Sequence, residues 1–92
     1  MTEAVRVSCA PDGHGWTCDA TIGTDAAATR HRVTVSPDLV ARLRPGSEDP
    51  TELVRDSFDF LLAREPRESI LSEFDLQVIG RYFPEWESRI AR

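Results

Sequence analysis

The sequence predicts an α+β fold, in which a three-stranded antiparallel β-meander is followed by helices that pack on one sheet face. Two observations support this class. Apolar and polar residues alternate with period two through the first 35 residues, as expected for strands that bury one face. After residue 36, proline and capping residues precede segments whose apolar residues have helical spacing. A chain of 92 residues predicts a single domain, 1–92, with the meander over 1–35 and a helical part over 36–92.

Three alternating segments predict the strands. Their apolar faces carry Val5, Val7 and Cys9; Trp16, Cys18, Ala20 and Ile22; and Thr29, His31, Val33 and Val35. Residues 11–15 have strong turn chemistry, and a second loop opens at Gly23. A turn at Gly13 and His14 places Cys9 opposite Cys18. A second loop over residues 24–27 then places Asp19 opposite Arg32, and these opposite charges support the register.

Capping signals predict the first two helices. Ser36 followed by Pro37 begins a short helix that runs to about Arg44. Asp49, Pro50 and Glu52 begin the main helix, which spans Pro50 to about Arg64. Its apolar residues cover an arc of about 200°, more than one sheet face needs, so we expect this helix to be covered on two sides.

The C-terminal third predicts shorter helices and holds most of the aromatic residues. The expected helices run from Pro66 to about Ser72, from Asp75 to about Arg81 and from Pro84 to about Ala91. A domain of this size has room for one small core, so surplus apolar side chains would be buried against a partner. The predicted interface residues are Phe60, Tyr82, Phe83 and Trp86. The alternative is that all four lie in the core, with the tail wrapped around the main helix.

The charge and the termini restrict the functional classes. The net charge of −5 disfavours nucleic-acid binding, because that affinity comes largely from neutralising phosphates. All eleven basic residues are Arg, which is typical of a GC-rich bacterial genome. The N-terminal segment lacks the features of a signal peptide, and no apolar run is long enough to span a membrane. We therefore expect a cytoplasmic protein with no membrane partner.

The two cysteines leave three readings open. In a reducing cytoplasm they are expected to be thiols that pack as small buried hydrophobes. A cross-strand disulfide between Cys9 and Cys18 is the second reading. The third is a zinc site at Cys9, Cys18 and His31, which share one predicted sheet face; the lack of a local chelating pair disfavours it. No metal or other cofactor is expected.

No motif predicts an enzyme. The carboxylates of the main helix form a solvated face, and no serine has a neighbouring histidine or a glycine-rich elbow. No glycine pattern forms a phosphate-binding loop. The sequence therefore favours a protein without catalytic activity.

Residues 30–65 resemble a ribbon-helix-helix module, with an alternating strand, a Pro-started helix, a Gly-containing turn and a capped amphipathic helix. In that family a dimer forms a two-stranded ribbon whose outward side chains read the DNA major groove. The resemblance implies that Arg30, Arg32 and Thr34 contact DNA, as in an antitoxin-like regulator. The first helix is about a turn shorter than in that family, and the strand is predicted to pair within the meander.

Most of the chain is also similar to a group of small uncharacterised prokaryotic proteins with three strands followed by helices. The shared features are Trp16-Thr17-Cys18, Arg64-Glu65-Pro66, Phe74-Asp75-Leu76 and Arg81-Tyr82-Phe83-Pro84. This resemblance implies a fold and a cellular setting and no activity. The sequence as a whole favours a small protein–protein interaction module, with a homodimer as one form of it, over a DNA-binding regulator or a metal-binding protein.

Overall fold

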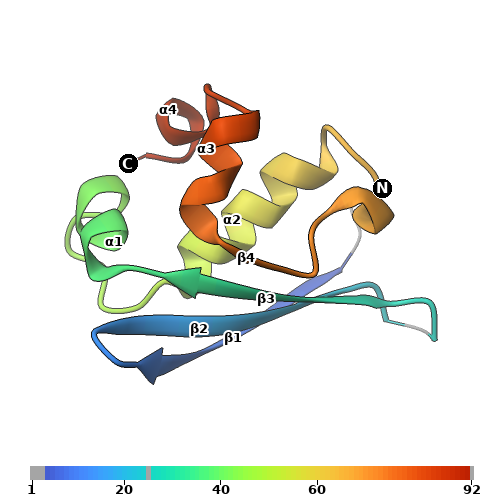
Figure 1. The fold of residues 1–92 in the computed structure, drawn as a ribbon, viewed down its shortest axis with the longest axis horizontal. Coiled ribbons are helices and arrows are strands. Elements are labelled where there is room, and N and C mark those ends of the chain that lie inside the picture. The colour runs from blue at the N-terminus through green and yellow to red at the C-terminus, as the bar shows by residue number, and fades with distance from the viewer. Residues whose placement is uncertain (1–3, 25, 92) are drawn as a thin grey trace.

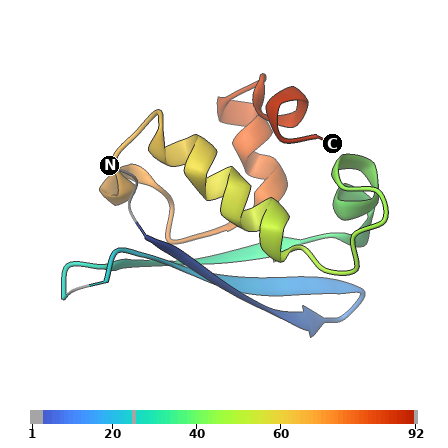
Figure 2. The same cartoon turned by 180° about the vertical axis from the view of Figure 1, so that it is seen from behind.

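A four-stranded mixed sheet lies below a layer of helices in the computed structural model, which describes residues 4–24 and 26–91 (Figure 1). The strand order is β1-β2-β3-β4. All helices cover the same sheet face, and the opposite face is open, as the view from behind also shows (Figure 2). This architecture confirms the predicted α+β class and the three-stranded antiparallel meander.

The meander has the predicted register. Strands β1 (Val5–Asp12) and β2 (Gly15–Ile22) pair with Cys9 opposite Cys18, and β3 (Thr29–Val35) pairs with β2 so that Asp19 is opposite Arg32. Gly13 in the first turn has a φ of 64°, a conformation that favours glycine. The guanidinium Nε of Arg32 lies 3.2 Å from Asp19 Oδ1.

The sequence did not predict the fourth strand. β4 (Glu73–Asp75) is parallel to β3, and the chain between them contains the two longest helices. The Arg32 backbone N–H donates to the Ser72 carbonyl (2.7 Å), which fixes the start of β4 against β3. A strand of three residues is too short to show a period-two pattern, so only its long-range partner identifies it.

The first two helices begin near their predicted starts. Helix α1 (Pro37–Leu43) is capped by Ser36, whose Oγ accepts from the Leu39 N–H (3.2 Å). Helix α2 (Thr51–Leu62) follows Asp49, whose Oδ1 accepts from the Thr51 N–H (2.9 Å).

The C-terminal third is more broken than predicted. It contains η1 (Arg67–Ser69), η2 (Leu76–Val78), α3 (Ile79–Tyr82) and α4 (Trp86–Ile90). The expected helix from Pro66 to Ser72 is a single 3-10 turn, because residues 70–75 are extended toward β3. Asp75 caps η2 as predicted: its Oδ1 accepts from the Gln77 N–H (3.1 Å).

Helix α2 is buried on two sides, as its wide apolar arc predicts. Below it, the Phe58 ring lies between His31 and Phe74, with ring-centroid distances of 5.5 and 6.1 Å. On its other side, the Trp86 indole N–H donates to Ser57 Oγ (3.1 Å). The sheet and the C-terminal helices therefore share one core, with α2 between them.

Cys9 and Cys18 form a disulfide, with their Cα atoms 4.0 Å apart. The expectation of two thiols is therefore wrong, and these sulfur atoms are not free to bind zinc. Directly opposite residues in neighbouring strands bring the two side chains together, and the sequence predicted that register correctly. Because disulfides persist mainly in oxidising compartments, this bond is at odds with the predicted cytoplasmic location.

None of the helices in the described ranges has the length and apolar character needed to cross a membrane.

Candidate functional site

The four predicted interface residues have different environments. Trp86 is completely buried, and Phe60 is buried with its ring edge-on to Phe83 (centroid distance 5.7 Å). The Arg64 guanidinium carbon lies over the Phe60 ring, 3.6 Å from the ring centroid. Phe83 is half-buried, whereas Tyr82 is 69% exposed. Phe60 and Trp86 are therefore core residues, and Tyr82 is the member of the set that faces solvent.

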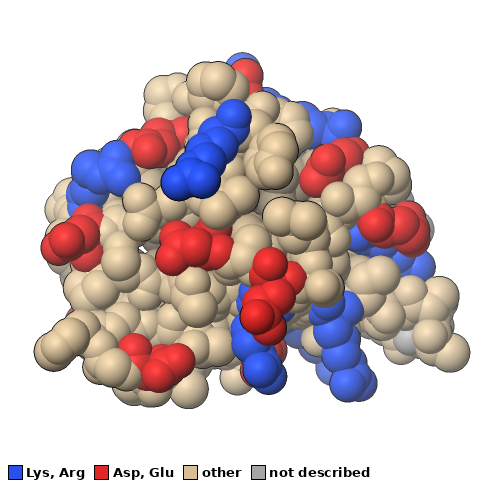
Figure 3. All heavy atoms as spheres, viewed as in Figure 1, with Lys and Arg blue, Asp and Glu red and all other residues tan. Residues whose placement is uncertain are grey.

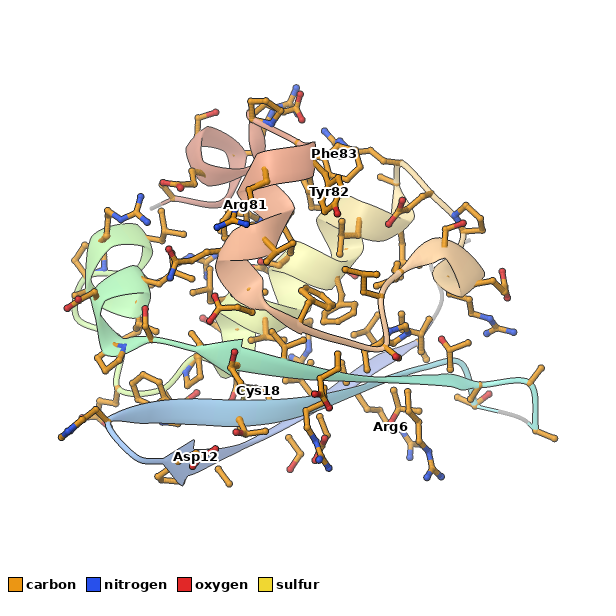
Figure 4. All side chains as sticks on the ribbon, in the orientation of Figure 1. Arg6, Asp12, Cys18, Arg81, Tyr82 and Phe83 are labelled. Atoms are coloured by element: carbon orange, nitrogen blue, oxygen red, sulfur yellow. A yellow bond between two sulfur atoms is a disulfide. The ribbon has the colours of Figure 1, made fainter. Side chains whose placement is uncertain are left out.

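Tyr82 and Leu71 are the exposed large hydrophobic residues of the described chain, at 69% and 50% exposure. They come from segments eleven residues apart in sequence, yet both line the same groove, whose volume is about 390 Å³. Figure 4 shows Tyr82 and Phe83 together at the end of α3, on the side toward α2. The other apolar walls are Leu61, Ile70, Phe74, Val78 and Ile79.

Local structure explains why Leu71 and Tyr82 face outward. The segment after η1 is fixed to β3 by two carbonyls: Leu71 O accepts from His31 Nδ1 (2.7 Å) and Ser72 O accepts from the Arg32 N–H. Ile70 is then buried and the adjacent Leu71 points away. In α3, Ile79 is buried, and Tyr82, three residues later near the same helix face, lines the same groove but is largely exposed.

Glu65 is the charged residue among those that line the groove. It is half-buried at the C-terminal end of α2. Its carboxylate makes no hydrogen bond or ion pair with the part of the chain that the structure describes. The groove therefore combines an apolar surface with one unpaired negative charge.

On the face drawn in Figure 3, a mostly uncharged area lies between α3 and the η1 turn, and both acidic and basic side chains border it. Tyr82, which Figure 4 labels in the same orientation, lies on this side of the molecule. Glu65, the charged residue in the lining, therefore favours a positively charged group on whatever binds in the groove.

His31 is a core residue. It is 4% exposed; Nδ1 donates to Leu71 O, and Nε2 lies 3.0 Å from Thr29 Oγ1. Both ring nitrogens therefore have protein partners, and among residues 4–24 and 26–91 no cluster of His, Cys, Asp or Glu side chains is arranged to hold a metal ion. His31 supports the groove by holding the backbone that carries Leu71.

The predicted DNA-contact residues lie on the open sheet face. Arg30, Arg32 and Thr34 are exposed, but Arg32 pairs with Asp19 and lies opposite Glu73, and Thr34 Oγ1 donates to Asp75 Oδ2 (3.0 Å). Strand β3 has neighbours on both edges, so it cannot pair with a second copy to form the ribbon of a ribbon-helix-helix dimer.

Sequence reasoning missed Leu71 and Glu65. The adjacent apolar pair Ile70-Leu71 in a short turn was the available signal, because neighbouring side chains of an extended segment point in opposite directions. Glu65 precedes Pro66 at a helix end, and only the fold reveals that it lines the same groove as Tyr82.

Comparison with known proteins gives no relative from which to transfer a role: no protein-family model, curated protein or solved structure matches this chain.

Proposed function

We propose that this protein is a non-enzymatic interaction module that binds a segment of a partner protein in the groove between Leu71 and Tyr82. The observation that carries the proposal is that the exposed large hydrophobic side chains of the described chain lie on one apolar groove. Exposed apolar area of this kind costs free energy in water, and binding of a partner recovers it.

The groove suits a bulky apolar side chain flanked by a basic residue. Its volume of about 390 Å³ is at the small end of the range for ligand pockets, which fits an anchor side chain from a partner. Glu65 supplies the complementary charge for an adjacent Arg or Lys. Tyr82 contributes a large contact area at low entropy cost, as aromatic residues do at protein interfaces.

A displayed library of random peptides, selected against the wild-type protein, tests this proposal. We expect enriched peptides to contain an aromatic or aliphatic anchor next to Arg or Lys. Their binding should shift the backbone NMR signals of residues 70–71 and 78–82. A Leu71→Ser, Tyr82→Ser double variant should reduce affinity at least tenfold, as expected when a central anchor contact is lost.

Two further variants make the test specific. Glu65→Gln should weaken binding of the basic peptides and reduce the salt dependence of their affinity, without affecting peptides that carry only the apolar anchor. The matched control is Arg89→Ser, an exposed change on α4, which should leave binding unchanged.

The proposal is overturned if selected peptides bind equally well to the Leu71→Ser, Tyr82→Ser variant, or if their NMR shifts map to another surface. Selection of no peptide, together with saturable binding of a small apolar probe such as an anilinonaphthalene dye at the same residues, would instead assign the groove to a small-molecule ligand.

A further inference from the structure

We propose that two copies of this chain pair through their β1 strands, antiparallel about a two-fold axis, to form one continuous sheet. Strand β1 is the first in the sheet order, and among residues 4–24 and 26–91 nothing pairs with its outer edge. An exposed strand edge presents backbone donors and acceptors that another strand can satisfy. This interface is separate from the groove, one wall of which is Phe74 in β4, the strand at the opposite edge of the sheet.

The β1–β2 ladder determines which backbone groups face outward. The Gly23 N–H donates to the Ala4 carbonyl (2.8 Å), so Ala4 and Gly23 form a hydrogen-bonded pair. Such pairs alternate with non-hydrogen-bonded pairs along an antiparallel ladder, and the 4.0 Å Cα–Cα distance of Cys9 and Cys18 is typical of the second type. The N–H and C=O groups of Val5, Val7 and Cys9 therefore point away from β2.

Pro11 selects the register of the proposed pairing. It is the next outward-facing residue of β1, and it has no N–H to donate. A two-fold axis at Val7 places Val7 opposite its own copy and Val5 opposite the copy's Cys9. All outward groups of these three residues are then hydrogen-bonded. Moving the axis to Ser8 places Pro11 opposite Val5, which leaves the number of hydrogen bonds between the copies unchanged but leaves the Val5 carbonyl of each copy without a donor.

The side chains are compatible with this register. On the open sheet face Arg6, which projects below the strands in Figure 4, lies opposite the copy's Ser8, so the two arginines do not face each other. On the inner face, Val5, Val7 and Cys9 are only half-buried in the monomer. Pairing brings these apolar side chains beside their counterparts and removes more of their surface from water.

A second copy fits this edge better than it fits the other sheet edge. Strand β4 has only three residues, two of which are Glu73 and Asp75, and charges on a short strand oppose edge pairing. Over residues 5–10, β1 carries Arg6 as its charged residue. The copy's β1 has the same unsatisfied groups, so one symmetric contact satisfies both chains.

Measurements of molar mass and of amide hydrogen exchange test the proposed dimer in the wild-type protein. Light scattering at increasing concentration should show a rise from 10.3 kDa to twice that mass. In the dimer, the amide hydrogens of Val5, Val7 and Cys9 should exchange at least tenfold more slowly than in dilute monomer. The amides of Arg6 and Ser8 bond to β2 in both states and serve as internal controls.

Oxidative cross-linking tests the register. In an Arg6→Cys, Ser8→Cys double variant, each introduced thiol lies opposite one of the partner copy, so a covalent dimer should form under mild oxidation. Ser8→Cys alone should not cross-link in this register but should in the one centred on Ser8. In the double variant and in the control, every introduced cysteine lies on the open sheet face, away from the native disulfide.

A mass of 10.3 kDa at every concentration overturns the proposal, as does a dimer in which the Val5, Val7 and Cys9 amides exchange freely. Loss of the dimer in the Leu71→Ser, Tyr82→Ser variant would place the contact at the groove, and it would overturn the β1 interface. Failure of peptide binding at the groove leaves the predicted dimer unaffected, so the two proposals are separable.

Discussion

Two buried polar side chains, Arg44 and Ser57, link the helices of this protein through hydrogen bonds. Arg44, which is 5% exposed, donates from Nε to the Ile90 carbonyl (3.0 Å) and from Nη2 to Asp56 Oδ2 (2.7 Å). It thereby joins the end of α1 to α2 and α4. Ser57 accepts from Trp86 and donates to the Leu53 carbonyl (2.8 Å). Buried polar groups cost free energy unless paired, so these contacts fix how the helices meet.

Asp59 gives a pH-dependent prediction at the residue scale. Burial raises the pKa of its carboxyl above the ordinary 3.8; the nearby Asp56 charge adds to this, and Arg55 partly opposes it. A raised pKa in the folded state means that the ionised carboxylate destabilises the fold, and stability is lost as pH rises from 3.8 through the higher folded value. Asp59→Asn should therefore raise the urea midpoint at neutral pH and have little effect well below pH 3.8.

Asp49 serves as a control, because the pKa of its carboxyl is shifted in the opposite direction. Its hydrogen bonds with Thr51 lower the pKa of its carboxyl, so its stabilisation is present above 3.8 and is lost as pH falls through the lower folded value. Asp49→Ala should lower the midpoint at neutral pH. Equal effects of Asp59→Asn at neutral and acidic pH would show that the change acts through packing and not through the charge.

At the scale of elements, the β1–β2 hairpin is fixed by its turn and by the disulfide. Asp12 and Gly15 close a two-residue turn, and Cys9–Cys18 joins the strands three pairs farther along. Cys18 is fully buried beneath the helices, whereas Cys9 is half-buried at the sheet edge. The cross-link holds the edge strand β1 against β2 and so presents a rigid edge.

Reduction of the disulfide should lower the free energy of unfolding. The cysteines are nine positions apart, and opening a loop of this size releases chain entropy in the unfolded state worth about 2–3 kcal/mol. Urea denaturation with and without dithiothreitol measures the difference. A Cys9→Ala, Cys18→Ala variant is the control and should show the same stability in both conditions. An unchanged wild-type midpoint after complete reduction would contradict the prediction.

At the scale of the whole molecule, α2 lies between the sheet and the C-terminal helices, as Figures 1 and 2 show. The aromatic residues divide accordingly: Phe58 and Phe74 pack toward the sheet side, and Phe60 and Trp86 pack between helices. Because one core joins these layers, damage to either side should affect the stability of the entire chain.

Trp86→Ala should therefore destabilise the whole domain. Removal of a fully buried indole costs about 3–5 kcal/mol and also leaves Ser57 without its donor. Tyr82→Ala, four residues away and largely exposed, should change stability by no more than about 0.5 kcal/mol. Chemical denaturation of the two variants measures the free energy of unfolding that each one loses. Comparable losses in both would mean that Tyr82 belongs to the core and would weaken the proposed groove.

Several features could be predicted because they depend on nearby residues. The registers that place Cys9 opposite Cys18 and Asp19 opposite Arg32 follow from a two-residue turn, a short loop and the period-two pattern. The caps Ser36 and Asp75 act on N–H groups two or three residues away. Phe83 and Trp86 could not be separated from Tyr82 by sequence, because α3 and α4 are too short to define a buried face.

The sequence by itself determined the strands, their register, the helix starts and the need to cover α2 on two sides, since turn geometry, capping and side-chain periodicity act over short distances. The tertiary structure decided the rest. It added β4, buried His31 and Arg44, and left Leu71 and Tyr82 exposed on one groove. These outcomes depend on which distant segments meet, as in the hydrogen bond between His31 and the Leu71 carbonyl, and no local pattern encodes those contacts.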